Sequence, residues 1–387
     1  MNAVVLAIGW QVYDLARRTM GIESAALRLG LIGLLQFAPV VLLTPVSGLV
    51  ADRVDRRLAS SLSLAVQLTG ALFLAALAFS HAMSLLALYT VAFALGVFRV
   101  FYMPAMNALA PNLVPPQALQ SAVAVNAIAG RTGAVLGPVL GGAFYARGPG
   151  FAFLLAAVLL CFAIGGLATI RWSGHPSVDR PPARPGHIWE GLGYVRRHRF
   201  LLGAISLDLF AVLFGGATAM LPAYARDILA VGPQGLGLLR ASPAIGALAS
   251  ALWFAWRPTT RRAGGLMLGA CSVFGFATIA FGLSRSFALS MACLMLIGAA
   301  DMVSVVIRQS LVQLQTPDAM RGRVGAISTL FISASNELGE AESGFMAAVM
   351  GLVPSVVFGG AGAVLVTALW SRLFPELRKG PTPPSAA

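Results

Sequence analysis

Charged side chains within long apolar segments are the residues of this sequence that could carry chemistry. A charge in such a segment is costly and is usually retained for a function. Glu337 and Glu340 are three residues apart, so on a helix they share one face. Two carboxylates this close in a medium of low dielectric bind protons more readily, as a proton carrier requires. The further candidates for proton coupling or substrate binding are Arg99, Arg131, Asp208 and Asp301.

The two glutamates have structural alternatives. Buried charges need partners, so Glu337 and Glu340 could form static ion pairs with Arg99 or Arg131. A helix that ends early would instead leave both acids in an outer loop. Arg131 could also bind an anionic substrate. The sequence leaves these alternatives open.

The two aspartates could likewise be structural. Asp208 and Asp301 could pair with Arg308 or with Arg99. Asp301 precedes Arg308 by 308 − 301 = 7 residues, about two helical turns, so a tie within one helix is also open.

The elements that hold these residues have to be membrane helices. Of the 387 residues, 58% are hydrophobic and 11% are charged, and the mean hydropathy is +0.83. A soluble domain is roughly 45–50% apolar and about 25% charged, so the excess apolar surface must face lipid. At about 20 apolar residues per span plus a loop, the chain has room for about twelve helices. The sequence predicts an all-α integral membrane protein.

The first apolar segment is short. Residues 1–13 would reach only about 20 Å as a helix, against a hydrocarbon core of ~30 Å. We therefore expect the first helix to be truncated, or the true start codon to lie upstream.

A proline-rich polar stretch divides the chain. Its second part is basic and amphipathic and is expected to lie on the cytoplasmic membrane face. The predicted organisation is an N-terminal transmembrane half at 1–171, this linker at 172–199, a C-terminal transmembrane half at 200–373 and a disordered cytoplasmic tail at 374–387.

The distribution of arginines predicts the orientation. Loops rich in Lys and Arg lie in the cytoplasm. The richer set of loops, which includes Arg53, Arg171, Arg257 and Arg321, is expected to be cytoplasmic, together with the C-terminus. The opposite loops hold Arg17, Arg18, Arg28, Arg147, Arg226 and Arg285.

The two halves are similar to each other. Gly33-Leu-Leu-Gln-Phe-Ala-Pro39 is similar to Gly237-Leu-Leu-Arg-Ala-Ser-Pro243, at an offset of 237 − 33 = 204 residues. Pro116-Gln-Ala-Leu119 is followed in the same order by Pro317-Asp-Ala-Met320. These matches indicate an internal duplication in parallel orientation, with two pseudo-symmetric halves of about six helices each, related by an axis along the membrane normal.

A charged motif follows the second predicted helix. Gly48-Leu-Val-Ala-Asp-Arg-Val-Asp-Arg-Arg57 resembles motif A of the major facilitator superfamily, although Asp55 stands where that family has glycine. The resemblance implies that the motif holds the cytoplasmic side closed near the start of the eleventh helix. The alternative is a run of positive charge that only sets topology. The motif residues are Gly48, Asp52, Arg53, Arg56 and Arg57.

The fifth predicted helix carries a glycine motif. Glycines at 133, 137 and 141 recur every four residues, so they lie on one face and allow another helix to approach. Pro138 favours a bend. The segment resembles motif C, which the same superfamily associates with antiporters; ordinary packing of small residues is the alternative. Its residues are Gly133, Gly137, Pro138, Gly141 and Gly142.

Two C-terminal segments narrow the resemblance. Arg308 to Val324 and Ser335 to Gly344 are similar to the branch of that superfamily that contains the enterobactin exporter and related bacterial efflux proteins. The resemblance implies the major facilitator fold and a proton-driven exporter of the bacterial inner membrane, working by alternating access. We expect a small amphipathic substrate, such as a siderophore or a drug-like compound. Solute uptake and a non-transporting sensor or assembly role remain alternatives.

Several functional classes are excluded. Lys379 is the only lysine, so the chain has no Walker A motif and is not expected to bind ATP. The histidines lie in predicted loops, which excludes haem ligation between helices and HExxH metal chemistry. The arginines lie at the ends of apolar runs rather than on one soluble face, which argues against nucleic acid. We expect a non-enzyme without metal or cofactor, whose partners are the lipid bilayer, protons and a small-molecule substrate.

Overall fold

The computed structural model describes residues 1–53, 56–109, 114–169, 186–256 and 263–379. Of residues 44–53, 56–57, 59, 103–109, 116, 119–120, 123, 186–189, 318–319, 326 and 379 it describes the backbone alone. Within the described ranges the chain forms helices and no strand. Helices are the structures that satisfy backbone N–H and C=O groups where water is absent. The predicted all-α class is confirmed.

The helices before residue 170 follow the predicted apolar segments. They are α1 Asn2–Arg17, α2 Ile22–Arg53, α3 Arg56–Phe79, α4 Leu85–Leu109, the short η2 Pro116–Ala118, α5 Leu119–Tyr145 and α6 Pro149–Thr169.

The later helices begin with the second part of the linker. They are α7 Gly186–Arg197, α8 Arg199–Phe214, η3 Gly216–Met220, α9 Leu221–Ala223, η4 Tyr224–Ile228, α10 Gly232–Trp256, α11 Ala263–Leu283, α12 Phe287–Gln315, α13 Asp318–Met350, α14 Leu352–Leu373 and α15 Pro375–Lys379. Gly351, with a φ of 92°, lies in the left-handed region and ends α13 before α14 begins.

Ten helical segments of the described chain are long and apolar enough to cross a membrane. One of them, Arg199–Ile228, runs from α8 through η4. Two further helices occupy the remaining predicted positions. The first, α1, has 16 residues, and α13 has 33 residues but carries several acids.

The helices pack into two compact units. Unit 1 comprises Met1–Gly21, Leu31–Arg184 and Val231–Ala241. Unit 2 comprises Ile22–Gly30, Pro185–Ala230 and Ser242–Ala387. Since α2 and α10 each contribute to both units, the domain boundaries predicted from the sequence stay a prediction.

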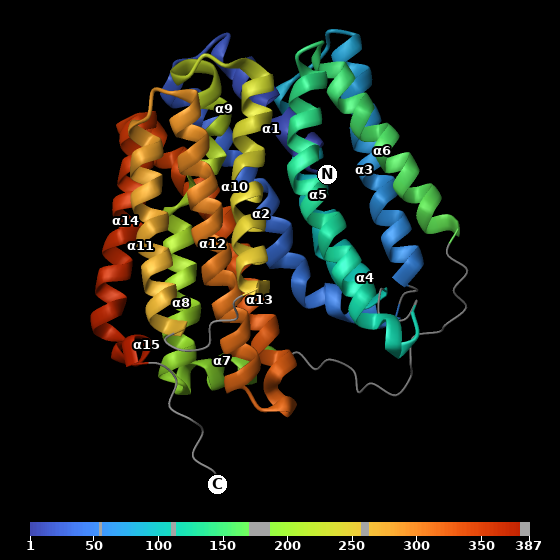
Figure 1. The fold of residues 1–387 in the computed structure, drawn as a ribbon. Coiled ribbons are helices and arrows are strands. Elements are labelled where there is room, and N and C mark those ends of the chain that lie inside the picture. Colours follow the sequence, from blue (N-terminus) through green and yellow to red (C-terminus); the bar gives the residue numbers. More distant parts are fainter. Residues whose placement is uncertain (54–55, 110–113, 170–185, 257–262, 380–387) are drawn as a thin grey trace. The chain divides into compact units, whose positions relative to one another are not determined.

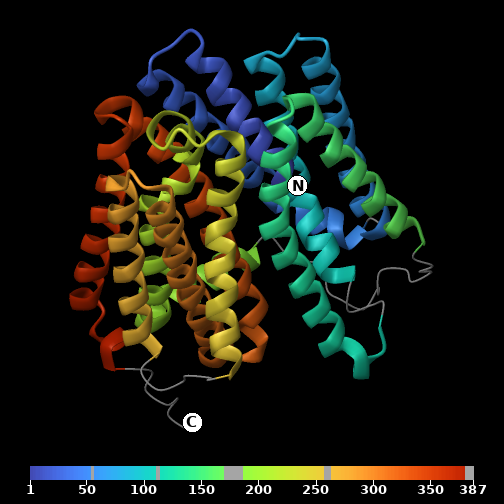
Figure 2. The ribbon, with the colours of Figure 1, turned by 45° about the horizontal axis from the view of Figure 1, so that its top comes forward.

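In unit 1, α3 packs between α4 and α6 (Figures 1 and 2). Leu64 and Ala71 of α3 meet Ala157 and Leu160 of α6 in a small apolar core. The other long contact of this unit joins α1 to α5.

In unit 2, α11 packs against α12 and α14, and α8 packs against α13 and α14. The core where these helices meet contains Leu207, Met267, Cys271 and Leu311. It also contains Leu377, which is fully buried although it lies in the segment predicted to be a disordered tail. That segment begins instead with α15, because Leu377 completes the apolar core.

The sequence repeat is matched by an equivalent helix crossing in each unit. In unit 1, a methyl group at Gly96 of α4 would lie 2.8 Å from the carbonyl oxygen of Gln36 in α2. In unit 2, a methyl group at Gly298 of α12 would overlap the backbone of Pro243 in α10. The two glycines are 298 − 96 = 202 residues apart, close to the offset of the repeat, and each faces the repeated segment.

The amphipathic segment α7 differs from its prediction. Its Val195 is fully buried in a core with Leu201, Val312 and Val324, which come from α8, α12 and α13. The described part of its apolar face, around Val195, is therefore covered by protein. Burial raises the pKa of the Tyr194 phenol, which stays protonated and donates to the carbonyl of Gln315 at 3.0 Å.

The crossing at Gly298 makes a testable prediction. We expect Gly298→Ala to lower the stability of the detergent-solubilised protein by about 1–3 kcal/mol, because the added methyl must displace backbone. Gly269 of α11, where a methyl would meet no atom within 4 Å, is the matched control. Thermal unfolding of both variants checks this, and equal melting temperatures would contradict the crossing.

Candidate functional site

A transmembrane helix of unit 2 is interrupted. The helix α8 ends at Phe214, and the chain continues through the tight turns of η3, the short α9 and the π-helical η4. At the interruption the N–H of Gly215 donates to Ala211 and Val212, both at 3.0 Å, and the N–H of Ala217 donates to Gly215 at 2.7 Å. Irregular backbone at membrane depth occurs where it is buried in protein or lines a cavity, and in transporters it forms binding sites.

The helix α13 covers this interruption. A methyl group at Gly216 would overlap the carbonyl of Gly339 and lie 2.6 Å from the Ser343 hydroxyl oxygen. A methyl group at Gly339 would lie 2.9 Å from the carbonyl oxygen of Leu213. The interrupted segment and α13 therefore meet backbone to backbone, and this contact requires glycine in each of them.

The predicted proton-coupling acids flank this contact. Glu337 is 3% exposed, and Glu340 is half-buried one turn further along α13. Because α13 is continuous from Asp318 to Met350, the alternative that placed both acids in an outer loop is wrong. The structure thus places both acids in the continuous helix α13, as sequence neighbours of Gly339, which meets the interrupted backbone.

A second buried charge site ties α8 to α12. Asp208 and Arg308 form an ion pair, and their side chains are 3% and 1% exposed. The Ser304 hydroxyl donates to the other carboxylate oxygen of Asp208 at 2.8 Å. Of the pairings open to Asp208, the one with Arg308 is confirmed, and it joins two helices. Asp301 is half-buried on α12, and its charge interacts with the Cys271 thiol.

The Arg308 guanidinium is incompletely satisfied. It donates to Asp208 through Nη1, while Nε and Nη2 have no hydrogen-bond partner among the described residues. The Cys271 thiol lies 4.0 Å from the Ser304 hydroxyl and completes this polar cluster inside the apolar core.

The candidate arginines belong to unit 1. Arg99 on α4 and Arg131 on α5 are both half-buried. Glu337, Glu340 and Asp301 belong to unit 2. Pairing of these acids with Arg99 or Arg131 therefore stays a prediction.

The motif C glycines divide into two sets. Gly137 and Gly141 face α1, where a methyl group would lie 2.9 Å from Asn2 Cβ and 3.0 Å from Ala3 Cα, respectively. At Gly133 there is open space, although its carbonyl accepts a hydrogen bond from Asn2 Nδ2 at 3.1 Å. The expected close approach is present at two of the three positions.

The remaining motif C residues contact α10. A methyl group at Gly142 would lie 3.1 Å from the Cα of Gly237, and the Pro138 carbonyl oxygen lies 2.6 Å from the place of a methyl at Gly237. Pro138 is accommodated within α5. The side chains of motif A, from Gly48 to Arg57, lie outside the described residues; there α2 ends at Arg53 and α3 begins at Arg56.

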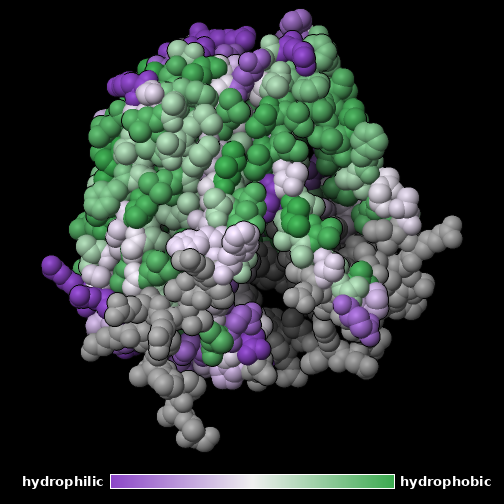
Figure 3. All heavy atoms as spheres, viewed as in Figure 1, coloured by the Kyte–Doolittle hydropathy of each residue, from purple (hydrophilic) through white to green (hydrophobic). Residues whose placement is uncertain are grey.

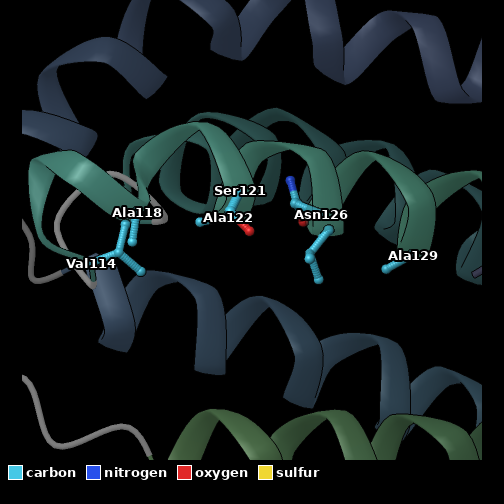
Figure 4. A pocket seen from close by; sticks show the side chains of 7 residues that line it. Val114, Ala118, Ser121, Ala122, Asn126 and Ala129 are labelled. Carbon is cyan, nitrogen blue, oxygen red and sulfur yellow. The ribbon is translucent and has the colours of Figure 1, made fainter.

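An apolar groove of about 470 Å³ runs along the first half of α5. Figure 4 shows its lining side chains following one helix and the turn before it. Ser121 and Asn126 are its polar members, and none of the lining residues is charged. The others are Val114, Ala118, Ala122, Val125 and Ala129.

The interruption at Gly215 and Gly216 was not predicted from the sequence. The adjacent glycines inside an apolar segment were the available signal, because glycine weakens a helix and allows backbones to approach. Within the described residues, no group of three or more His, Cys, Asp and Glu could hold a metal ion.

Comparison with known proteins decides the family. The profile of the Major Facilitator Superfamily matches residues 3–340. The chain belongs to this superfamily. It is therefore a multi-pass membrane transporter, and its family and structural neighbours are transporters rather than enzymes.

Curated relatives within the Major Facilitator Superfamily are exporters. The enterobactin exporter EntS of Citrobacter koseri is 31% identical over 347 residues, which are 88% of this chain and 81% of that protein. EntS of Escherichia coli O1:K1 is 29% identical, again over 88% of this chain and over 82% of that protein. The predicted resemblance to the enterobactin-exporter branch is confirmed.

Solved structures confirm the major facilitator fold. A bacterial homologue of the human lysosomal transporter Spinster, inward-facing and unoccupied, matches with a TM-score of 0.74 at 14% identity, over 98% of this chain and 96% of that one. A bacterial homologue of the iron transporter ferroportin matches with a TM-score of 0.63 at 18% identity, over 96% and 97% of the two chains.

The ion pair of Asp208 and Arg308 makes a second prediction. Arg308→Met should cost about 3–5 kcal/mol of stability, because it leaves an unpaired carboxylate in the core. The double variant Asp208→Leu/Arg308→Met should cost less than the arginine change alone. A double-mutant cycle of unfolding in detergent measures this, and costs that simply add would show that the two side chains are not coupled.

Proposed function

We propose that this transporter is a secondary active exporter, in which proton entry drives small amphipathic molecules out of the cell by alternating access. The observation that carries the proposal is that Glu337 and Glu340 lie in α13, whose Gly339 packs on the interrupted backbone of the span Arg199–Ile228. Interrupted helices at membrane depth are where transporters bind substrates and coupling ions. Buried carboxylates in such positions form proton relays.

The partners of Asp208 distinguish this acid from a proton carrier. Asp208 has a guanidinium and a hydroxyl on its two oxygens, so its charge is already compensated. We therefore assign a static tie to Asp208. We assign proton coupling to Glu337 and Glu340 because they are three residues apart on the helix that packs on the interrupted span. Asp301, Arg99 and Arg131 are further candidates to contact substrate or to exchange partners during the cycle.

The substrate class is supported by the groove on α5 and by the relatives. A site for an amphipathic molecule needs mostly apolar walls with a few polar groups, as Ser121 and Asn126 provide. The relatives named enterobactin exporter favour export of a siderophore or of a drug-like compound.

The motifs complete the proposed cycle. Motif A would close the cytoplasmic side, and motif C would allow α5 to pack on α1 and α10 while the protein exchanges protons for substrate. The arginine-rich loops favour a bacterial inner membrane protein with a cytoplasmic C-terminus.

Proton flux in everted membrane vesicles tests the proposal. Vesicles made acid inside are given a panel of siderophores and lipophilic drugs. We expect a compound to collapse the pH gradient with the wild type and not with Glu337→Gln/Glu340→Gln, because amides cannot carry a proton. Glu23→Gln, which removes an exposed acid at the start of α2, is the matched control and should behave as wild type.

The other possible outcomes of this experiment lead to different conclusions about the two glutamates and about export. Equal responses of the wild type and the double variant would make the two glutamates structural. No response to any compound would count against export and favour uptake, or a sensor or assembly role, as the next hypothesis to test.

The groove on α5 makes a prediction about specificity. Asn126→Leu should raise the apparent KM of a hydroxylated substrate about fivefold, since one hydrogen bond contributes about 1 kcal/mol. The maximal rate of proton exchange should stay unchanged. Transport of a hydroxylated compound and of its deoxy analogue by wild type and variant would measure this; an equal change for both analogues would rule out recognition by Asn126.

A further inference from the structure

One end of unit 2 carries exposed arginines without acidic partners. Arg196 and Arg197 end α7, Arg372 lies in the last turn of α14, and Arg378 lies in α15. None of the four has an ion-pair partner among the described residues.

Two acids among the described residues of this end are already neutralised. Glu190 pairs with Arg323, and Glu376 pairs with Arg199 at 3.1 Å. The four arginines therefore leave a local excess of positive charge, which the fold itself does not compensate.

Arg199 joins the two parts of this end. Its Nη2 donates to the carbonyl of Leu373 at 3.0 Å, and its guanidinium lies 5.9 Å from the centre of the Phe374 ring. Only His198 separates Arg199 from the end of α7, so the arginines of α7 lie beside the junction of α14 with α15. We call Arg196, Arg197, Arg372 and Arg378 the basic rim.

An apolar stripe on α14 leads to the basic rim. Leu365, Leu369 and Leu373 are 69%, 46% and 50% exposed, and their spacing of four residues places them on one helix face. From the first to the last they extend about 12 Å, close to the ~15 Å depth of one leaflet of the hydrocarbon core. Figure 3 shows hydrophobic residues over α11 and α14 and hydrophilic residues at the end near α15.

We propose that the basic rim and the leucine stripe form a binding site for an anionic phospholipid. One acyl chain lies along Leu365, Leu369 and Leu373, and the phosphate is bound by Arg372 and Arg378. Guanidinium groups suit this role because their planar array of donors matches phosphate oxygens. Arg196 and Arg197 attract the headgroup through their charge. A soluble phosphate compound would leave the leucine stripe uncovered, which is why the two features together select a lipid.

The site has a consequence for unit 2. The ends of α8, α14 and α15 already meet at Arg199, Leu373 and Glu376. A bound headgroup would add a counter-ion where the cations of α7, α14 and α15 converge. The anionic lipid should therefore stabilise the folded transporter.

The test uses the full-length protein purified in a neutral detergent and titrated with dioleoylphosphatidylglycerol or dioleoylphosphatidylcholine. Melting temperature and lipid retention in native mass spectrometry are measured. We expect the anionic lipid alone to be retained and to raise the melting temperature. Arg372→Gln/Arg378→Gln should bind it roughly 30-fold more weakly, as the loss of two arginines at an anionic surface implies.

Two control variants make the result specific. Arg147→Gln/Arg285→Gln removes the same charge from exposed arginines of the sparsely charged loops and should bind the lipid as the wild type does. Arg372→Lys/Arg378→Lys keeps the charge and should retain most of the binding. Wild-type affinity should also fall as salt is raised.

The opposite results would overturn the site. These are equal binding by the glutamine double variant and the wild type, an equal loss in the Arg147/Arg285 control, or the same stabilisation by inorganic phosphate or by the neutral lipid. If the glutamine variant does not fold, the lysine variant and the salt series decide: a lysine variant that loses the lipid, or a salt-independent affinity, would refute the proposal.

Discussion

The interrupted helix at Gly215 and Gly216 sets the main constraint on unit 2. Within a bilayer no water is present to satisfy freed backbone groups, so a break in a span has to be covered by protein. Here α13 covers it through Gly339 and Ser343. Glu337 and Glu340 are close neighbours of Gly339 in the sequence, so they lie on α13 near the depth of the break. The depth of the acids is therefore tied to the contact that covers the interrupted backbone.

The helix α8 is held at several depths by different kinds of interaction. At its start Arg199 contacts Glu376 and Leu373. Further along, Ser206 accepts a hydrogen bond from the Trp370 indole at 2.9 Å. About one half-turn later, Asp208 pairs with Arg308 of α12. These polar ties lie on the first part of the span, while the irregular backbone that packs on α13 lies beyond them.

Much of this architecture could be predicted from the sequence. The lengths of the apolar segments predicted the helices. The similar segments that end at Pro39 and Pro243 predicted the internal duplication, and the helix crossings at Gly96 and Gly298 agree with it. Asp208 could be predicted as a buried charge, because a charged residue within a long apolar segment can be recognised without knowing its partner. Its pairing with Arg308 was one of several alternatives, since spacing along a chain does not say which helices become neighbours.

Other features depended on tertiary contacts that leave little trace in sequence. The amphipathic pattern of α7 suits a membrane surface and a protein groove equally, and only the cluster around Val195 distinguishes the two. The last segment has the composition of a charged, proline-rich tail, yet Leu377 is buried in the core and Glu376 pairs with Arg199. The glycine pair at 215 and 216 could be taken for ordinary helix packing until its neighbours on α13 were known.

The equivalent crossings at Gly96 and Gly298 have a consequence for the history of the protein. Three residues beyond each glycine stands an ionisable side chain, Arg99 in one unit and Asp301 in the other. Copies produced by gene duplication begin with the same residue at both places. The backbone contact was kept in both copies while the charge three residues away became opposite in sign. The two units thus share a backbone crossing but carry opposite charges three residues beyond it.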